Sequence, residues 1–437
     1  MANEKQLKIG ILSINYPTAA LNLACPLHSA VFSKVLNELG YENVIVDYHP
    51  DYYVEYVQKN SGPHVKMKWV NLENQEEYES KVMSWMEMTS TRKKRYNKIQ
   101  TFYDNHYTFS ENRYTSDSMD QLDSAEGINC YIAATDIIWE YRATQGGFDK
   151  GFFMACRAMR NSYKIAYAAS RRKDNYKGKA KQEFINLIKN IPSISVRERT
   201  FSESIAAISG IKPDVVLDPV FLKDKEFYRK LMASPERKSY VLVYIVVESA
   251  DNLVKLAAKF AEVNDLDLIE LSQYSYHKEQ TGYQRHIVIC DTGVEEWIGY
   301  INNADYIFTN SFHGCCLSII LEKQVFHGER TEEKVDLIME TFGLQWRKAE
   351  EAINIDTGEA LVGDIDCLQI NITRKELVHK SMNFLINALK NAERFVNRKS
   401  EKIEIGQERI MAMNLSEHRP AESAGLEAAG CRRPGDV

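Results

Sequence analysis

Long apolar segments are missing from this chain of 437 residues. No run approaches the roughly 20 consecutive apolar residues that a membrane-spanning helix needs. The opening Met1-Ala-Asn-Glu-Lys-Gln6 also lacks the apolar stretch of a signal peptide and leads straight into a strand-like segment. The sequence therefore predicts a cytoplasmic protein without a transmembrane segment.

Cysteine spacing of the kind that holds zinc is missing as well. The eight cysteines are scattered along the chain, with no CxxC pair among them. Several stand within apolar runs, where a thiol behaves as a small hydrophobic group. We expect reduced and mostly buried cysteines, no metal and no cofactor.

An excess of positive charge is the third missing feature. The formal net charge of −6 argues against nucleic acid as the main partner. The basic run Thr91-Arg-Lys-Lys-Arg-Tyr96 fits a solvated helix face better than a site for an acidic substrate, which stays the alternative. The apolar share of 44% and the charged share of 27% are those of a soluble globular protein, and the length fits two domains.

Short apolar strands alternate with helical segments in two successive blocks. The first block, residues 1–225, opens with strand-like segments at 7–14 and 43–48, and the second block, residues 238–372, opens with one at 240–247. Such alternation predicts parallel sheets covered by helices on both faces. We expect an α/β protein with two Rossmann-like domains that face each other across a cleft.

Three segments depart from this alternation. Residues 51–123 are polar and rich in Tyr, Lys and Arg, which predicts a helical insertion in the N-terminal domain that could cover the cleft. Residues 373–400 contain an amphipathic pattern, which predicts a helix that braces the two domains. After about Lys402 the chain changes character, and Ser416–Gly430 contains few large apolar side chains, so we expect residues 401–437 to be disordered.

The most informative segment is a strand that turns directly into a helix. The strand-like Tyr306–Thr309 is followed by Asn310, Ser311, His313 and Gly314, and then by a helical pattern. Such a turn leaves free backbone N–H groups, and the helix dipole favours an anion there. Glycine lets a ligand approach the backbone, and histidine can transfer a proton to it. The alternative is a buried histidine satisfied by backbone carbonyls at an ordinary turn.

Five short motifs, taken in order, resemble those of the polysaccharide pyruvyl transferase family. They are Ala134-Thr-Asp-Ile-Ile-Trp139, Ile165-Ala-Tyr-Ala-Ala-Ser170, Ser195-Val-Arg-Glu198, Leu217-Asp-Pro-Val220 and Thr309-Asn-Ser-Phe-His-Gly314. The resemblance runs from Lys8 to about Arg347. It implies a fold similar to that of the two-domain GT-B glycosyltransferases. It also implies transfer of a pyruvyl group from phosphoenolpyruvate (PEP) onto two hydroxyls of a saccharide, forming a pyruvate ketal in cell-surface or exopolysaccharide biosynthesis.

The residues predicted to handle PEP come mainly from the C-terminal domain. His313 is the predicted proton donor to the enol carbon of PEP. Arg197 is the predicted anion clamp, and its alternative is a structural salt bridge to an acid such as Glu198. The other predicted PEP-side residues are Asn310, Ser311, Gly314 and Lys334.

The residues predicted to hold the acceptor come from the N-terminal domain. Asp136 would orient a hydroxyl, and Trp139 would stack on a sugar face unless it belongs to the core. The others on this side are Asn15 and Ser170. Arg171 and Arg172 follow Ser170 and are candidates for binding a phosphate, but adjacent side chains point different ways, so we do not expect both to serve. The segment Asp218-Pro219 is interpreted as a structural turn into the interdomain linker.

The chain departs from the family pattern in three places. Ala134 and Thr135 replace a Gly-Ser pair at the end of a strand-like segment. Asn15-Tyr-Pro-Thr18 replaces an Asn-Tyr-Gly-Ala loop, and Lys334 replaces an arginine, which exchanges a two-pronged donor for a point charge. Two alternatives therefore stay open, namely a nucleotide-sugar glycosyltransferase of the GT-B type and a catalytically silent relative that binds a glycan or a partner enzyme. The expected partners are PEP as co-substrate, a saccharide or lipid-linked saccharide acceptor, and polysaccharide machinery at the membrane periphery, but no nucleic acid.

Overall fold

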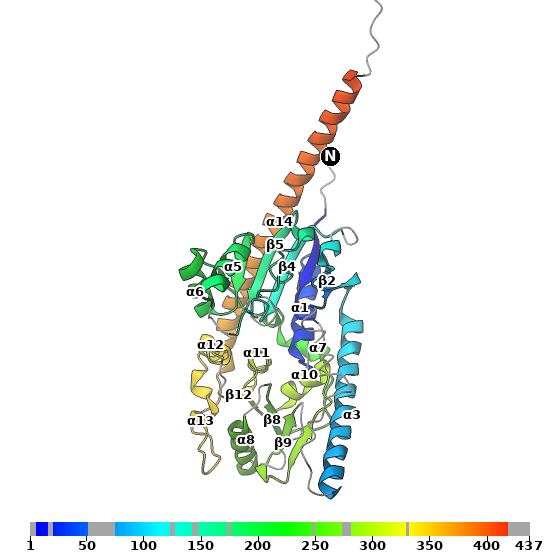
Figure 1. Ribbon diagram of the computed structural model, residues 1–437. Helices are drawn as coiled ribbons and strands as arrows, with labels where there is room; N and C mark the ends of the chain where they lie inside the picture. Colours follow the sequence, from blue (N-terminus) through cyan, green and yellow to red (C-terminus); the bar gives the residue numbers. More distant parts are fainter. Residues whose placement is uncertain are drawn as a thin grey trace, which may run out of the picture.

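The structure is a computed structural model that describes residues 6–15, 21–50, 75–122, 127–141, 147–172, 176–246, 250–272, 281–328 and 332–417. Within these ranges, the side chains of residues 75–89 and 400–417 are not described. The chain forms two parallel sheets with helices around them, drawn one above the other in Figure 1.

The N-terminal sheet has seven parallel strands in the order β3-β2-β1-β4-β5-β6-β7. The strands are β1 (Lys8–Leu12), β2 (Glu42–Tyr48), β3 (Phe109–Tyr114), β4 (Cys130–Asp136), β5 (Tyr163–Ala169), β6 (Ser193–Val196) and β7 (Asp214–Val215). Its helices are α1 (Ala24–Glu38), α5 (Gly178–Ile188) and α6 (Arg199–Ser209), with short 3-10 turns η1 (Met119–Gln121) and η3 (Arg157–Met159). The central strands β4 and β5 are buried along almost their whole length, as expected when helices cover both faces of a parallel sheet.

The C-terminal sheet has five parallel strands in the order β10-β9-β8-β11-β12. The strands are β8 (Tyr240–Tyr244), β9 (Asp267–Leu271), β10 (His286–Ile289), β11 (Tyr306–Thr309) and β12 (Gln324–His327). Its helices are α8 (Asp251–Val263), α10 (Val294–Asn303), α11 (Phe312–Ile320), α12 (Lys334–Thr341) and α13 (Ala349–Ala352), with the 3-10 turn η5 (Gln345–Arg347). Elements η4 (Pro219–Leu222) and α7 (Lys225–Leu231) connect the two sheets along the chain. The predicted pair of Rossmann-like α/β domains is confirmed.

The strand order reverses direction once in each sheet. In the N-terminal sheet this switch lies between β1 and β4, and in the C-terminal sheet it lies between β8 and β11. Ligand sites of open parallel sheets form at the carboxyl ends of the strands beside such a switch. Helix α1 follows β1 and helix α11 follows β11, so each helix begins beside a switch point.

The predicted helical insertion at residues 51–123 is present in part of that segment. Helix α3 (Gln75–His106) is present, and residues 51–74 lie outside the described residues. The buried Phe102 belongs to the same core cluster as Trp297 of α10, and Lys98 Nζ lies 2.8 Å from Glu296 Oε2. Helix α3 therefore runs alongside both domains (Figure 1) and joins them, rather than covering a cleft.

Strand β3 contradicts the prediction that residues 51–123 are helical throughout. It lies at the edge of the sheet and pairs with β2. Its sequence FSENRY is mostly polar and three of its residues are exposed, so it lacks the apolar run of a central strand. Polar edge strands of this kind have little signal in the sequence.

The basic run at residues 91–96 is not fully solvated. Lys93 and Lys94 are exposed, but Arg92 is only 8% exposed and Arg95 only 2% exposed. Arg95 donates a hydrogen bond from Nε to the carbonyl of Leu21 at 3.1 Å. The prediction of a solvated helix face is therefore wrong for the two arginines, which are buried where α3 meets the rest of the molecule.

The C-terminal helix α14 (Cys367–Glu417) is longer than predicted. Leu385 and Leu389 are buried in a core cluster with residues of β1, β4 and β5, whereas Leu377 packs against the cluster that includes the C-terminal domain. The helix then extends beyond the body of the molecule (Figure 1). Disorder from residue 401 onward is thus the wrong prediction as far as Glu417, because Glu, Lys, Gln, Arg and Met favour helix. Residues 418–437 lie outside the described residues.

None of the helices in the described part of the chain combines the length and the apolar character needed to cross a membrane.

Candidate functional site

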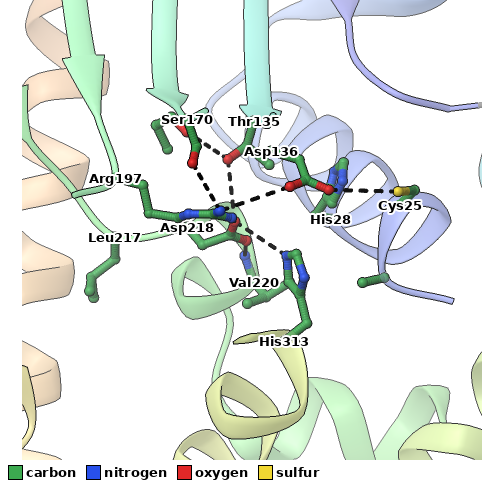
Figure 2. A network of polar contacts seen from close by, with 12 residues as sticks. Cys25, His28, Thr135, Asp136, Ser170, Arg197, Leu217, Asp218, Val220 and His313 are labelled. Atoms are coloured by element: carbon green, nitrogen blue, oxygen red, sulfur yellow. Dashed lines mark hydrogen bonds and ion pairs between the residues drawn. The ribbon is translucent and has the colours of Figure 1, made fainter. Parts of the chain in front are cut away.

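Polar side chains from both domains meet at the carboxyl ends of the N-terminal strands (Figure 2). Asp136 ends β4, Ser170 follows β5, Arg197 follows β6 and Asp218 lies just beyond β7. Because the carboxyl ends of parallel strands lie at one edge of a sheet, these four residues are brought together. His313 reaches them from α11 of the other domain.

Arg197 is the buried cation of this cluster. Its side chain is 3% exposed, and it donates hydrogen bonds from Nε to Glu198 Oε1 at 3.0 Å, from Nη1 to Asp218 Oδ2 at 3.0 Å and from Nη2 to Ser170 Oγ at 3.2 Å. Burial alone would lower the pKa of Arg197, but the carboxylates of Glu198, Asp218 and Asp136 raise it well above its usual value. The salt bridge to Glu198 that was weighed as the alternative is present. A direct contact between Arg197 and an anionic ligand stays a prediction.

The face of the Arg197 guanidinium lies 3.9 Å from the centroid of the Phe312 ring. Phe312 is the first residue of α11, so this cation–π contact crosses the boundary between the domains. It seats the start of α11 directly against the strand end that carries Arg197.

Asp218 is a functional candidate that the sequence reasoning missed. Its side chain is fully buried, and Oδ2 accepts a hydrogen bond from Thr135 Oγ1 at 3.2 Å in addition to the one from Arg197. Burial would raise the pKa of this carboxyl, but the charges of His313 and Arg197 hold it well below its usual range. Oδ1 accepts from the N–H of Val220 at 3.2 Å, which caps η4. The residue does form the predicted turn, but it is also the carboxylate at the centre of the cluster.

The ring of His313 faces the carboxylate of Asp218. Its Nε2 lies 3.4 Å from Asp218 Oδ2, and its side chain is 7% exposed. The ring stacks on that of His28, with centroids 5.7 Å apart and planes at 29°. The neighbours of the ring are therefore a carboxylate and a second imidazole, an arrangement suited to proton transfer.

The residues around His313 build the turn on which it stands. Ser311 Oγ accepts a hydrogen bond from the N–H of Gly314 at 3.2 Å and so caps α11. Asn310 Oδ1 accepts from the N–H of Val246 at 3.2 Å and links the ends of β11 and β8. A Cβ at Gly314 would lie 2.7 Å from Thr309 Oγ1, so glycine is needed for close packing of helix on strand. Contacts of these residues with PEP stay a prediction.

Helix α1 contributes Cys25 and His28, which the sequence reasoning also missed. Cys25 Sγ donates to Asp136 Oδ2 at 3.8 Å, and burial together with Asp136 raises the pKa of the thiol well above its usual value. His28 is fully buried, and burial lowers its pKa to about 4. The one available signal was the CxxH spacing of Cys25 and His28 at the start of a predicted helix.

Asp136 stands between Arg197 and Cys25. Burial would raise the pKa of its carboxyl, but Arg197, which lies 3.8 Å from Oδ1, and Lys334 hold that pKa well below its usual value. The carboxylate is therefore charged at neutral pH, and its two oxygens face different partners.

Trp139 does not line the site, so the prediction that it stacks on a sugar is wrong. Its side chain is fully buried, the ring stacks on Phe153 with centroids 5.1 Å apart, and Nε1 donates to the carbonyl of Phe152 at 3.3 Å. The edges of Phe184 and Phe201 also face it. This aromatic cluster takes the indole into the core, although the residue follows a strand end.

Two other predicted site residues, Arg171 and Asn15, are buried. Arg171 is 3% exposed, with its guanidinium carbon 4.3 Å from the centroid of the Phe201 ring and Nη2 3.6 Å from Glu333 Oε1. Asn15 donates from Nδ2 to the carbonyl of Val46 at 3.1 Å, which holds the chain after β1. Residues 16–18 of the altered loop lie outside the described residues.

A cavity of about 260 Å³ opens beside the cluster, between the two domains. Its walls include Arg197 and Asp218 from the N-terminal domain, and Phe312 and Lys334 from the C-terminal domain. Lys334 is 4% exposed, its Nζ lies 3.4 Å from Glu332 Oε2, and burial, followed by the charge of Arg197, lowers its pKa. The cationic side chains of Arg197 and Lys334 thus line this cavity together with the carboxylates of Glu198, Asp218 and Glu340.

A larger cavity of about 610 Å³ lies between the β6–β7 edge and α14. None of the residues that line it belongs to the group formed by Asp136, Ser170, Arg197, Asp218 and His313. We place the candidate site at the smaller cavity, because the buried ionisable side chains of Arg197, Glu198, Asp218 and Lys334 line it. His313 is not among the lining residues, but its Nε2 lies 3.4 Å from Asp218 Oδ2.

A protein-family model and several solved structures match the chain. The family model described as "Polysaccharide pyruvyl transferase" matches residues 28–327. No curated protein matches the chain.

Several solved structures are distantly similar to the chain. A UDP-GlcNAc 2-epimerase from Neisseria meningitidis bound to UDP-GlcNAc is 10% identical, with a TM-score of 0.44 over 91% of this chain and 100% of that one. A UDP-GlcNAc 2-epimerase from Methanocaldococcus jannaschii is 9% identical, with a TM-score of 0.42 over 86% of this chain and 100% of that one. A glycosyltransferase from Rickettsia africae is 12% identical, with a TM-score of 0.42 over 91% and 98%. Likenesses this distant carry no conclusion about activity.

Proposed function

Because the chain belongs to the polysaccharide pyruvyl transferase family, we propose that it transfers a pyruvyl group from PEP onto two hydroxyls of a saccharide to form a pyruvate ketal. The observation that carries this proposal is the pairing of His313 with Asp218 beside a cavity lined by Arg197 and Lys334. The reaction needs both parts, a proton donor and a cationic site for the donor molecule. The ketal would be made for a cell-surface polysaccharide or exopolysaccharide.

The cavity fits the charge of PEP, which carries a phosphate and a carboxylate. Lys334 is the leading contact, because its ammonium group has three donors and its nearest acid is Glu332 at 3.4 Å. Arg197 has already committed three donors to Glu198, Asp218 and Ser170. Because Asp218 and Glu198 already balance its charge, Arg197 would contribute one further hydrogen bond to the donor molecule through a remaining N–H.

Ketal formation begins with a proton added to C3 of PEP, which makes C2 electrophilic. We assign this proton to Nε2 of His313, and Asp218 provides the counter-charge when the ring carries both protons. The first sugar hydroxyl then adds to C2, and its proton returns to the site. The second hydroxyl replaces the phosphate at C2, and its proton leaves with the phosphate. The sum is PEP and a diol giving a ketal and phosphate, with no other reactant.

Asp136 is placed to orient the acceptor. Its carboxylate stays charged and lies at the same strand edge as Arg197, so it can accept a hydrogen bond from a sugar hydroxyl. Its depressed pKa makes it a poor base, and the role proposed for it is orientation rather than proton removal.

Phosphate release from PEP in the presence of candidate saccharides tests the proposal. The wild-type protein should release phosphate only with a suitable acceptor. The variant His313→Ala should lose this activity while its melting temperature stays almost unchanged. His379→Ala is the matched control, because His379 is exposed on α14 and lines only the larger cavity. A normally active His313→Ala variant refutes the proton role.

Thermal stabilisation by ligands separates this proposal from its rivals. A pyruvyl transferase should be stabilised by PEP, because a ligand that binds only the folded state raises the melting temperature. Stabilisation by a UDP- or GDP-sugar but not by PEP would indicate a glycosyltransferase. Saccharide binding without any phosphate release would indicate a silent relative.

A further inference from the structure

Cys25, His28 and Asp136 bring three potential metal ligands together at the acceptor side of the crevice. A sulfur, an imidazole nitrogen and a carboxylate oxygen lie within 4.8 Å of one another, and Cys25 Sγ is 3.8 Å from Asp136 Oδ2 (Figure 2). A tetrahedral zinc ion with ordinary bond lengths holds a sulfur and an oxygen ligand about 3.6 Å apart. The sulfur and the carboxylate oxygen therefore already have nearly the spacing of two ligands on one metal ion.

The hydrogen bonds of His28 determine which of its two ring nitrogens carries the lone pair. Ser29 Oγ donates to Ser13 Oγ at 2.9 Å, so it accepts from His28 Nδ1, which is 3.2 Å away. With the proton on Nδ1, the other ring nitrogen, Nε2, carries the lone pair that a metal needs. This Nε2 is buried and has no hydrogen-bond partner among the described residues. A polar atom without a hydrogen-bond partner in a fully buried side chain indicates that a ligand binds there.

The local charges suit a divalent cation. Asp136 faces Arg197 with Oδ1 at 3.8 Å and Cys25 with Oδ2, so Oδ2 is turned away from the arginine. The charge of Arg197 is shared with Asp218 and Glu198, which balance it. On metal binding the Cys25 thiol releases its proton to solvent, and the thiolate and the carboxylate together supply two negative charges.

We propose that Cys25, His28 and Asp136 bind a divalent transition-metal ion of the zinc class. Thiolate and imidazole ligands select such ions over magnesium and calcium, which prefer oxygen. Three protein ligands leave one tetrahedral position for water or a substrate oxygen. The site stands on these residues alone and does not depend on the proposed pyruvyl transfer, so it is tested without any activity assay.

Cobalt spectroscopy on the tag-free, metal-stripped protein is the test. Titration with Co²⁺ should produce a thiolate-to-cobalt charge-transfer band together with the intense visible bands of a tetrahedral ion. The variant Cys25→Ser should lose the charge-transfer band. Cys156→Ser should keep it, because Cys156 is a half-buried cysteine outside the group. No charge-transfer band in the wild type, or an unchanged band in Cys25→Ser, overturns the proposal.

Zinc affinity, measured by competition with a chromophoric chelator, tests the other two ligands. Asp136→Asn and His28→Gln should each weaken zinc binding by more than about tenfold, the lower end of the effect of losing even an outer partner of a ligand. Asp136 has a φ of +68°, and asparagine adopts this conformation as readily, so the first variant tests the ligand and not the backbone. Ser29→Ala should weaken binding by about tenfold through the orientation of His28. Unchanged affinity in both ligand variants, with folding verified by circular dichroism, overturns the site.

Discussion

His313 and Asp218 face each other across the domain boundary, with Nε2 and Oδ2 3.4 Å apart. The histidine stands in the first turn of α11, and the aspartate lies just beyond β7. The same Oδ2 atom accepts a hydrogen bond from Arg197, so one buried carboxylate joins the imidazole to the cation. Any movement between the domains changes the separation of this pair.

The first prediction concerns Asp218→Asn, which removes the counter-charge of the His313 ring. We expect pyruvyl transfer to fall by roughly 100-fold, the lower end of what a positioned acid contributes. The measurement is the rate of phosphate release from PEP, with folding checked by circular dichroism. Activity equal to that of the wild type would contradict this role of Asp218.

The second prediction concerns Arg197→Ala, which leaves Asp218 and Glu198 buried without their cation. The free energy of unfolding should fall by about 3–5 kcal/mol, as measured by urea denaturation. Arg199→Ala, whose exposed side chain pairs only with Glu203 among the described residues, should change it by less than about 0.5 kcal/mol.

Arg197 was also predicted as an anion clamp, and calorimetry on the folded protein tests that role. PEP affinity should weaken by about tenfold or more, since hydrogen bonds to charged groups contribute roughly 1.5–3 kcal/mol. If Arg197→Ala has normal stability but binds PEP weakly, the structural role of Arg197 is contradicted. If the variant is destabilised but binds PEP normally, Arg197 does not belong to the donor site.

The third prediction concerns Lys334→Met, which keeps the length of the side chain and removes its charge. PEP should bind about tenfold more weakly or worse. The stability of the protein should be little changed or slightly higher, because the buried ammonium group no longer has to be desolvated. Lys380→Met is the matched control, since Lys380 also lines the cavity but is exposed. Equal PEP affinities for the two variants would exclude Lys334 from the donor site.

The fourth prediction concerns the stability of the protein in mild acid. Burial lowers the pKa of His28 to about 4, and Asp136, Asp218, His313 and Arg197 are the charged groups around it. Between pH 4 and about 6.5 the unfolded chain binds a proton that the folded protein excludes. The free energy of unfolding is therefore not reduced by His28 above about pH 6.5. It falls by roughly 3 kcal/mol as the pH falls from there to 4.

Urea denaturation in the presence of a chelator measures this dependence. His28→Gln should show a shallower loss of stability across this window, and His379→Gln should behave like the wild type. The two aspartates contribute only below about pH 3.9, because their folded pKa values are depressed, so their effect is separable. Parallel curves for wild type and His28→Gln would contradict the prediction.

The fifth prediction concerns Trp139, which the structure assigns to the core. Trp139→Ala should lower the free energy of unfolding by about 3–5 kcal/mol. Trp139→Phe retains much of the packing and should keep the KM for the saccharide unchanged. A raised KM in Trp139→Phe at normal stability would restore the sugar-stacking role.

Regular elements were predictable from the sequence where apolar runs end at polar turns. Strands β2 (Glu42–Tyr48), β8 (Tyr240–Tyr244) and β11 (Tyr306–Thr309) lie where the pattern places them, although β8 ends before the predicted residue 247. The polar edge strand β3 and the last turns of α14 were missed, because neither contains the apolar periodicity on which the prediction rests.

The sequence by itself determined that Asp136, Ser170 and Arg197 share one edge of a sheet, because each follows a strand and parallel strands end on the same side. Only the tertiary structure decided that Arg197 is neutralised by Asp218 and Glu198, and that Trp139 turns into an aromatic cluster. The tertiary structure also placed Cys25 beside Asp136, 111 residues away along the chain, and His28 against His313 of the other domain. Local patterns specify where a strand ends, whereas the direction of a side chain at that end depends on packing against segments remote in sequence.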